Sequence, residues 1–457
     1  LMVILTYQLV KGGKIMIEEF DNVEKLRMDR CFQDKKREND DTRDGFQKDY
    51  GRLIHSPAFR RLQGKSQVFG AGSGDYYRTR LTHTLEVAQI ARQIAQRLSS
   101  SEIITSLPKN PGLQINPLVV ECAALAHDLG HPPFGHKGEH DLDRFLKEEE
   151  RYEGNAQNFR ILMNIEKRYS EFDGLNLTHA VLLAINKYPY SIEEHGSKGL
   201  YKTEWPQILE IRKKWNIPVE KPTLEAQLMD ISDDIAYSTH DIEDGMKAEK
   251  IRINYNFFME TPWLKETLVK EVSEVTIKNP TLWEGINVKK EIARVLEDYL
   301  KTWNEIKANI NNESLARQEF KAHYVNLFAN RVGVIEDNNW FKVSLVKKTN
   351  PSIEDSSLWR YMIILKKLAW VTLVEDLRVQ RLQKRGEIII TGLWNVFSDQ
   401  ENSSVIPKQW LEIYNSNSDK VSWKRFVADY ISGMTDSYAE KLYSELYGSK
   451  AGNIYGE

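Results

Sequence analysis

The chain of 457 residues is long enough for one large domain or for two to three ordinary ones. Hydrophobic residues make up 41% of it and charged residues 28%, which is typical of a globular protein with an ample core. The formal net charge of -3 excludes a global attraction to nucleic acids or acidic membranes, so any site for a polyanion must be local.

The cysteines, the lack of long apolar stretches and the N-terminus indicate where the protein is located. Cys31 and Cys122 fall on separate segments and indicate reduced thiols in a cytoplasmic protein. No stretch approaches the ~18 unbroken apolar residues of a membrane helix, so we expect no membrane association. The chain opens with Leu1 and Met16 follows, so we expect residues 1–16 to be an extended or non-native N-terminus, and we assign no role to them.

Basic and aromatic residues alternate between residues 44 and 69, in a stretch that includes AFRRLQGKSQVF. The glycine-rich loop GAGSGD follows at residues 70–75. It lacks the preceding strand and the Gly-Lys-Ser/Thr ending of a P-loop, so we exclude that motif.

An amphipathic helix is predicted over residues 78–98, because small and apolar residues recur there on one face. His83 lies in its first turn, three residues after Arg80. A lone helical histidine is more often structural than a ligand. The histidine-rich segment further along the chain favours the ligand role here.

That segment, ECAALAHDLGHPPFGHKGEH at residues 121–140, holds four of the ten histidines. Asn116 is a good N-cap and Pro117 suits the first helical position, while Gly130 and the prolines after it end the helix. The adjacent His127 and Asp128 are therefore predicted in the last helical turn. An imidazole and a carboxylate side by side are suitable ligands for a divalent metal.

Another helix is predicted to begin at Pro222 and Thr223, after a loop over residues 187–206 that either wraps a phosphate chain or is a mobile surface loop. Asp233, Tyr237 and Asp241 follow one another at intervals of four residues, so they share one strip of the helix. Crowded carboxylates repel one another unless a cation neutralises them; the alternative is a solvated acidic face.

The remaining sequence is mostly helical in pattern. Residues 361–397 predict one long helix with a basic stripe and with Gly386 as a break, and only the isoleucines at 388–390 hint at β-structure. Helical patterns far outnumber strand patterns, so we predict an all-α fold.

Three separated helices thus offer a histidine (His83), a His-Asp pair (His127 and Asp128) and an aspartate (Asp233). Mixed imidazole and carboxylate ligation suits Mn²⁺, Mg²⁺, Fe or Zn²⁺, and such ions activate water near neutral pH. Hydrolysis is the chemistry that fits this ligand set.

The order H…HD…D resembles the HD superfamily of metal-dependent phosphohydrolases, and within it the chain is similar to the deoxyguanosine triphosphate triphosphohydrolase (dGTPase) family. Four motifs carry the resemblance: AFRRLQGKSQVF at Ala58, RTRLTH at Arg78, HDLGHPPFGHKGE at His127 and SDDIAYSTHDIED at Ser232. They span residues 43–245. The resemblance implies a multi-helix HD-domain core at residues 17–250 and a helical C-terminal region at residues 251–457 packed on it.

The resemblance assigns roles to the residues of the predicted centre. His83, His127, Asp128 and Asp233 would bind the metal, with Mn²⁺ or Mg²⁺ expected first and Fe, Co or Zn as alternatives. His136 would be the catalytic histidine close to the scissile phosphate, and Glu139 would orient and charge it. A histidine steered by a nearby carboxylate is also the usual acid–base pair on chemical grounds.

The resemblance also implies a substrate pocket. Gln67 would contact the deoxynucleoside and help to exclude a 2′-hydroxyl. The triphosphate and sugar would be lined by Arg80, Lys187, Tyr237 and Asp241, with the cations neutralising phosphates. Secondary candidates are Lys198, Arg378 or Arg381, and His131 as a neighbour that packs or hydrogen-bonds beside the metal ligands.

We therefore expect a cytoplasmic hydrolase that attacks the α-phosphate of a dNTP, dGTP in the first place, and releases deoxynucleoside and tripolyphosphate. The resemblance further implies a homo-oligomer, often a hexamer in this family, and activation by a nucleotide or by single-stranded DNA.

Two alternatives stay open at this point. An HD-type nucleotide phosphodiesterase or 5′-nucleotidase would have the same metal site and a different substrate. A nucleic-acid-binding protein with a structural metal would use the basic segments around Arg60 and Arg381. The near-neutral net charge and the proton-transfer pair argue against the second alternative.

Overall fold

The computed structural model describes residues 22–33, 41–68, 78–147, 150–374, 376–417 and 419–448. The expected N-terminal extension at residues 1–16 and the glycine-rich loop at residues 70–75 lie outside these ranges. The described chain is mostly helical, with one small sheet, so the predicted all-α class is confirmed.

The first half of the chain forms helices around the predicted metal ligands, and residues 22–28 are also helical. The named helices are α2 (Gly45–Ile54), α3 (Pro57–Arg61), α4 (Arg80–Ser99), α5 (Glu102–Ser106), α6 (Pro117–Ala126), α7 (Gly135–Leu146), α8 (Gly154–Arg160), α9 (His179–Ile185), α10 (Ile192–His195), α11 (Trp205–Lys214) and α12 (Leu224–Lys247). Short helical turns lie at η1 (Leu62–Gly64), η2 (Pro111–Leu113) and η3 (Ile161–Ile165).

The second half contains the sheet and the remaining helices. These elements are α13 (Tyr255–Met259), α14 (Pro262–Lys278), η4 (Pro280–Trp283), α15 (Val288–Asn309), α16 (Glu313–Ala329), β1 (Val332–Asp337), β2 (Trp340–Lys347), β3 (Asn350–Glu354), α17 (Ser356–Val374), α18 (Leu377–Phe397), η5 (Gln400–Val405), α19 (Lys408–Asn415), α20 (Trp423–Ser432) and α21 (Asp436–Tyr447).

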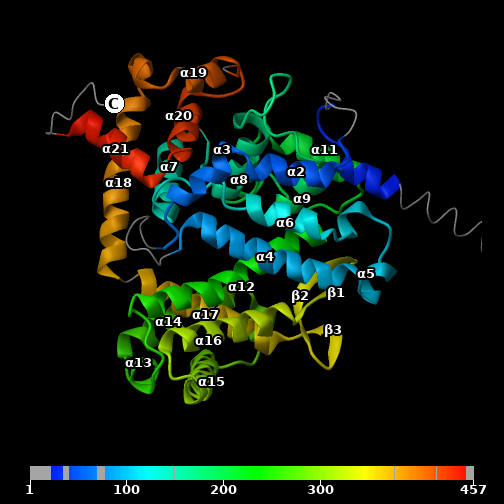
Figure 1. Ribbon diagram of the computed structural model, residues 1–457, viewed down its shortest axis with the longest axis vertical. Helices are drawn as coiled ribbons and strands as arrows, with labels where there is room; N and C mark the ends of the chain where they lie inside the picture. The colour runs from blue at the N-terminus through cyan, green and yellow to red at the C-terminus, as the bar shows by residue number, and fades with distance from the viewer. Residues whose placement is uncertain are drawn as a thin grey trace, which may run out of the picture.

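Helix α12 is the central element of the fold. It contacts α4, α6 and α9 of the first half and α16 and α17 of the second (Figure 1). Thr223 caps its N-terminus by accepting a hydrogen bond from the backbone N–H of Ala226. One cluster of buried apolar side chains continues from α4 through α12 to α17, across the boundary expected at residue 250, which stays a prediction.

A second apolar core lies where α18 packs against α7, α20 and α21, which stand together along one side of the molecule (Figure 1). Helix α7 carries His136 and Glu139. The C-terminal helices therefore support one of the segments that the sequence marks as catalytic.

The sequence misjudged two features of the second half. The long helix expected over residues 361–397 is two helices, α17 and α18, because Asp376 caps a new helix by accepting hydrogen bonds from the N–H groups of Arg378 and Val379. Gly386 lies inside α18 rather than at a break. The isoleucines at 388–390 are helical, whereas the β-structure lies at β1–β3.

The antiparallel hairpin of β1 and β2 turns at Asn338 and Asn339. Both asparagines have positive φ, 48° and 62°, as a tight hairpin turn requires. This pair of asparagines between apolar stretches was the available sequence signal. None of the helices in the described ranges has the length and apolarity to span a bilayer.

Asp429 joins the two halves through a buried ion pair. It accepts hydrogen bonds from Arg160 Nε at 2.7 Å and from Gln157 Nε2 at 2.9 Å. We expect Asp429→Ala to destabilise the protein by about 3–5 kcal/mol, because it leaves the Arg160 guanidinium buried without its main partner.

Thermal unfolding followed by circular dichroism measures this effect. Lys441→Ala is the matched control, because it removes an ion pair with Glu445 (3.8 Å) in which both side chains are exposed. Equal unfolding midpoints for the two variants would contradict the structural role of Asp429.

Candidate active site

Helices α4, α6 and α12 bring the four predicted metal ligands together. His83 comes from the first turn of α4, and its Nε2 lies 3.1 Å from Asp233 Oδ1 on α12. His127 Nε2 lies 3.6 Å from the same Asp233 oxygen and 3.5 Å from Asp128 Oδ1. Ligand atoms from three separate helices thus point into one small volume.

The end of α6 differs slightly from the expectation. Asn116 caps the helix and Pro117 occupies its first turn, as predicted. The helix ends at Ala126, so His127 is its C-cap and Asp128 lies in the turn beyond. This end lets both side chains point towards α4 and α12.

Hydrogen bonds orient two of these ligands. His127 Nδ1 is 2.6 Å from the carbonyl oxygen of Ala124 and must donate to it, which leaves a lone pair on Nε2. This Nε2 is buried and has no hydrogen-bond partner within the described residues. Arg80 Nη1 donates to Asp128 Oδ2 at 2.7 Å, and Oδ1 faces the histidines. The donor set therefore fits a divalent metal.

Both aspartates are held in the ionised form that a metal requires. Burial raises the pKa of Asp233, but His127 and His83 outweigh this effect and lower it to about 2. Burial likewise opposes ionisation of Asp128, and there His127 and Arg80 hold the pKa well below its usual range. Their negative charge is buried and calls for a cation between them.

Beside this centre, the first turns of α7 hold His136 and Glu139. His136 Nδ1 lies 3.3 Å from Glu139 Oε2, and the His136 side chain is 61% exposed. Glu139 Oε1 accepts a hydrogen bond from the backbone N–H of Gly154 at 2.8 Å. Burial raises the pKa of Glu139, but His136 and His131 lower it below its usual range. The pair is an oriented histidine with an ionised partner, open to solvent.

The turn between the His-Asp pair and α7 depends on close backbone packing. Gly130 donates its N–H to Asn158 Oδ1 at 2.6 Å, and Asn158 Nδ2 donates to the carbonyl of His127 at 2.5 Å. A Cβ on Gly130 would lie 2.2 Å from the carbonyl oxygen of Gly154, so only glycine fits. Asn158 thereby fixes the backbone that carries the predicted ligands His127 and Asp128.

The residues predicted to line the substrate lie at different distances from the centre. Gln67 Nε2 is 3.5 Å from the Tyr237 hydroxyl, and the Tyr237 ring lies 5.0 Å from that of His83. Asp241 is buried on the same helix as Tyr237, and burial raises its pKa to about 7. These three side chains form one wall beside His83.

The predicted cations are mostly engaged with carboxylates. Arg80 is 1% exposed and bound to Asp128, so in this structure it orients a ligand rather than projecting into open space. Lys187 is paired with Asp230. Lys198 is half-exposed and lies 2.7 Å from Glu153.

The other secondary candidates also have defined places. Arg378 and Arg381 are exposed near the start of α18. His131 Nε2 lies 3.2 Å from Asp128 Oδ1, so it stands beside the metal ligands as expected. His240 contacts Glu86, and His140 is an exposed neighbour of Asp141.

The sequence did not reveal Asp436, at the start of α21. One of its oxygens accepts from the backbone N–H of Ser66, next to Gln67, and the other accepts from Phe134 N–H, just before α7, both at 3.0 Å. Phe134 has a positive φ of 63°, which this contact helps to hold. The only local signal was a helix start at Thr435, because the partners are far away in sequence.

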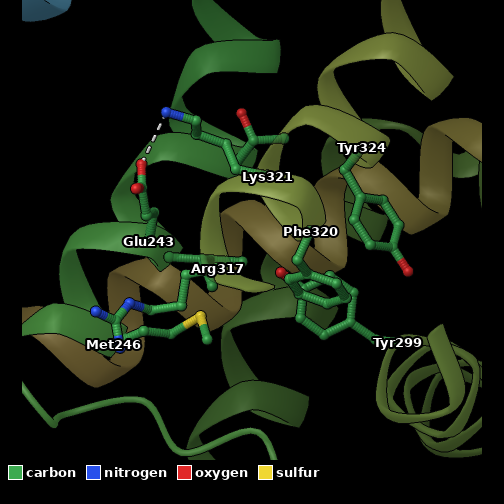
Figure 2. Close-up of a pocket in the computed structure, with 9 residues that line it drawn as sticks. Glu243, Met246, Tyr299, Arg317, Phe320, Lys321 and Tyr324 are labelled. Carbon is green, nitrogen blue, oxygen red and sulfur yellow. Dashed lines mark ion pairs between the residues drawn. The ribbon is translucent and has the colours of Figure 1, made fainter. Parts of the chain in front are cut away.

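Figure 2 shows a separate small cavity between α12, α15 and α16. Aromatic side chains and an ion pair of Glu243 with Lys321, 3.0 Å long, line it. Its walls contain none of the candidate ligands, so it is distinct from the candidate metal centre.

Comparisons with known proteins match this geometry. Residues 80–238 match the family model of the HD domain, and residues 356–445 match that of a phosphohydrolase-associated domain. The chain is similar to deoxyguanosinetriphosphate triphosphohydrolase-like protein 2 of Vibrio cholerae, with 31% identity over 409 residues and 89% of each chain covered.

Two further relatives carry the name deoxyguanosinetriphosphate triphosphohydrolase-like protein. The one from Geobacter sulfurreducens is 33% identical over 408 residues, covering 89% of each chain. The one from Rickettsia felis is 31% identical over 414 residues, covering 90% of this chain and 94% of its own.

Removing one ligand should weaken metal binding. Loss of a residue that only hydrogen-bonds to a metal ligand lowers metal affinity roughly 10–100-fold. We expect His127→Ala, which removes a ligand itself, to lower the Mn²⁺ affinity by more than this. Isothermal titration calorimetry measures the affinity, with His140→Ala as the control because His140 is an exposed histidine of the same segment. Unchanged affinity in His127→Ala would rule out this ligand role.

Asp436 should hold the Gln67 segment and the turn before α7. Hydrogen–deuterium exchange at the Ser66 and Phe134 amides is expected to accelerate about tenfold or more in Asp436→Ala, because each amide loses a hydrogen bond to a charged acceptor. Asp436→Asn keeps an oxygen acceptor for one of the two amides and should show the smaller effect. Equal protection in wild type and Asp436→Ala would exclude this positioning role.

Proposed function

Because the chain belongs to the deoxyguanosinetriphosphate triphosphohydrolase-like family of HD-domain hydrolases, we propose that it hydrolyses dNTPs, dGTP in the first place, to deoxynucleoside and tripolyphosphate. One observation supports this most strongly. His83, His127, Asp128 and Asp233 converge from three helices, with the pair of His136 and Glu139 beside them. A metal that activates water, next to a pair of side chains that transfers protons, is suited to phosphate ester hydrolysis.

His83, His127, Asp128 and Asp233 would hold a divalent metal, for which Mn²⁺ and Mg²⁺ are our first candidates and Fe, Co and Zn the alternatives. When bound, the metal supplies Lewis-acid polarisation of the phosphate and activation of water. Arg80 keeps the Asp128 carboxylate turned so that one oxygen faces the ion site.

The reaction breaks the bond between the α-phosphorus and the 5′-oxygen. Water adds to the phosphorus, and the 5′-oxygen leaves as an alkoxide that must gain a proton. His136 is exposed on the solvent side of the centre, where it can donate that proton from Nε2 while Nδ1 remains bonded to Glu139. The ionised Glu139 stabilises the imidazolium before transfer, as a buried acid does in other acid–base pairs.

The deoxynucleoside would lie against the wall formed by Gln67, Tyr237 and Asp241. Gln67 contacts Tyr237, so its amide is restrained, and a restrained amide beside the sugar would discriminate against an added 2′-hydroxyl. Lys187 would neutralise phosphate charge after exchanging its Asp230 partner for substrate.

The assembly and the effectors are part of the same proposal. We expect a cytoplasmic homo-oligomer, a hexamer in the first place, with a nucleotide or single-stranded DNA as activator. The family resemblance supports both expectations. Light scattering coupled to size-exclusion chromatography tests the oligomer directly.

A product assay tests the proposed reaction. Purified protein is incubated with each dNTP and Mn²⁺ or Mg²⁺, with and without a second nucleotide or single-stranded DNA, and the products are identified by chromatography. Tripolyphosphate and deoxynucleoside are expected. Release of pyrophosphate or of inorganic phosphate alone would show a different HD-type hydrolase.

The pair on α7 should control turnover and leave folding intact. We expect His136→Ala to lower kcat by about 10²–10⁴-fold, the usual contribution of general acid–base catalysis. His140→Ala serves as the control, since both histidines are exposed on α7. Wild-type turnover in His136→Ala would remove His136 from the mechanism.

A further inference from the structure

A second group of metal-binding side chains adjoins the first. The ligand atoms of His131, His136 and Glu139 all lie within 4.8 Å of one another. Glu139 Oε2 is 3.6 Å from His131 Nδ1 and 3.3 Å from His136 Nδ1. The two histidine rings stand nearly perpendicular, with centroids 5.3 Å apart. Three potential ligand atoms therefore face a common point.

The hydrogen bonding of His131 makes this arrangement unusual. Its Nε2 lies 3.2 Å from Asp128 Oδ1, and an ionised carboxylate only accepts hydrogen bonds, so Nε2 carries the proton. Nδ1 is the ring nitrogen that is turned towards Glu139 Oε2. This atom is buried and has no hydrogen-bond partner among the described residues.

The atom that faces this Nδ1 is a carboxylate oxygen, which only accepts hydrogen bonds. Glu139 Oε2 faces His131 Nδ1 at 3.6 Å, while the other carboxylate oxygen is already bonded to the Gly154 amide. A buried imidazole nitrogen opposite a carboxylate oxygen is unfavourable unless a positive charge, either a proton or a metal ion, lies between them. A metal ion bound by both His131 Nδ1 and Glu139 Oε2 would compensate the two atoms together.

We propose that His131, His136 and Glu139 form a second divalent-cation site, next to the first site and linked to it by Asp128. Two imidazoles and one carboxylate are the ligand set of open zinc sites and suit Zn²⁺, Ni²⁺ or Co²⁺ better than Mg²⁺. The exposure of His136 leaves room for water as a further ligand on the solvent side. His131 thus serves the first site through Nε2 and the second through Nδ1.

The consequence for catalysis rests on the proposed function. An ion on His136 Nδ1 and Glu139 Oε2 replaces the hydrogen bond between them. With the ion on Nδ1, the His136 ring keeps its proton on Nε2. It can no longer cycle between imidazolium and neutral imidazole, as a general acid must. Occupation of the second site is therefore inhibitory, and excess Zn²⁺ lowers turnover supported by Mn²⁺ at the first site.

Metal stoichiometry tests the site without any substrate. The full chain is dialysed to equilibrium against Zn²⁺, and bound metal is counted by mass spectrometry after a buffer exchange. We expect two ions per wild-type chain and one ion in Glu139→Gln and in His136→Ala. Asp233→Asn, which removes a ligand of the first site only, should keep the second ion.

Two results would overturn the proposal. One ion in the wild type means that the second site does not exist. Two ions in both Glu139→Gln and His136→Ala place the second ion elsewhere. Circular dichroism confirms that each variant is folded, and His136 is sufficiently exposed for its replacement to be tolerated.

The same samples separate this proposal from the proposed function. If the wild type binds one ion but still converts dGTP to tripolyphosphate, the second site fails and the function stands. If it binds two ions but releases no tripolyphosphate from any dNTP, the function fails and the site stands. With both intact, Zn²⁺ added to the Mn²⁺ enzyme should lower turnover about tenfold or more.

Discussion

The structure depends on one electrostatic constraint, which is the burial of the Asp128 and Asp233 carboxylates beside the rings of His83 and His127. Burying ionised carboxylates is costly unless cations or donors compensate them. Arg80 binds one side of Asp128, and the rings of His83 and His127 lie against Asp233 and lower its pKa. A divalent cation at the centre would compensate the buried carboxylate charge, and α4, α6 and α12 pack closely enough for their side chains to share it.

The C-terminal helices contribute contacts that hold the backbone around this group of carboxylates and histidines. Asp436 holds the backbone of the Gln67 segment and the turn that leads into α7, while the buried Lys65 donates to the carbonyl oxygens of His131 and Ser432. Lys65 is fully enclosed by these contacts, and its burial lowers its pKa to about 7. The C-terminal region thus forms part of the support of the active site as well as a second core.

The sequence was most informative where chemistry and local signals coincide. The Asn116 cap, Pro117 and the glycine and prolines after Asp128 defined a helix end, and the residue types near it indicated a metal. It was least informative where a partner is distant. Nothing near Asp436 or Asp429 indicates that these carboxylates bind segments hundreds of residues away, because such contacts depend on the packing of whole helices. The hairpin of β1 and β2 was missed although its two asparagines marked the turn.

The central claim is that three helices share one metal ion at His83, His127, Asp128 and Asp233, beside His136 and Glu139. Anomalous diffraction from a crystal grown with Mn²⁺ tests it most directly. The account predicts an anomalous peak about 2.0–2.3 Å from the nitrogen and oxygen atoms of those four ligands. No peak at this position, or coordination that leaves out His83 and Asp233, would contradict it.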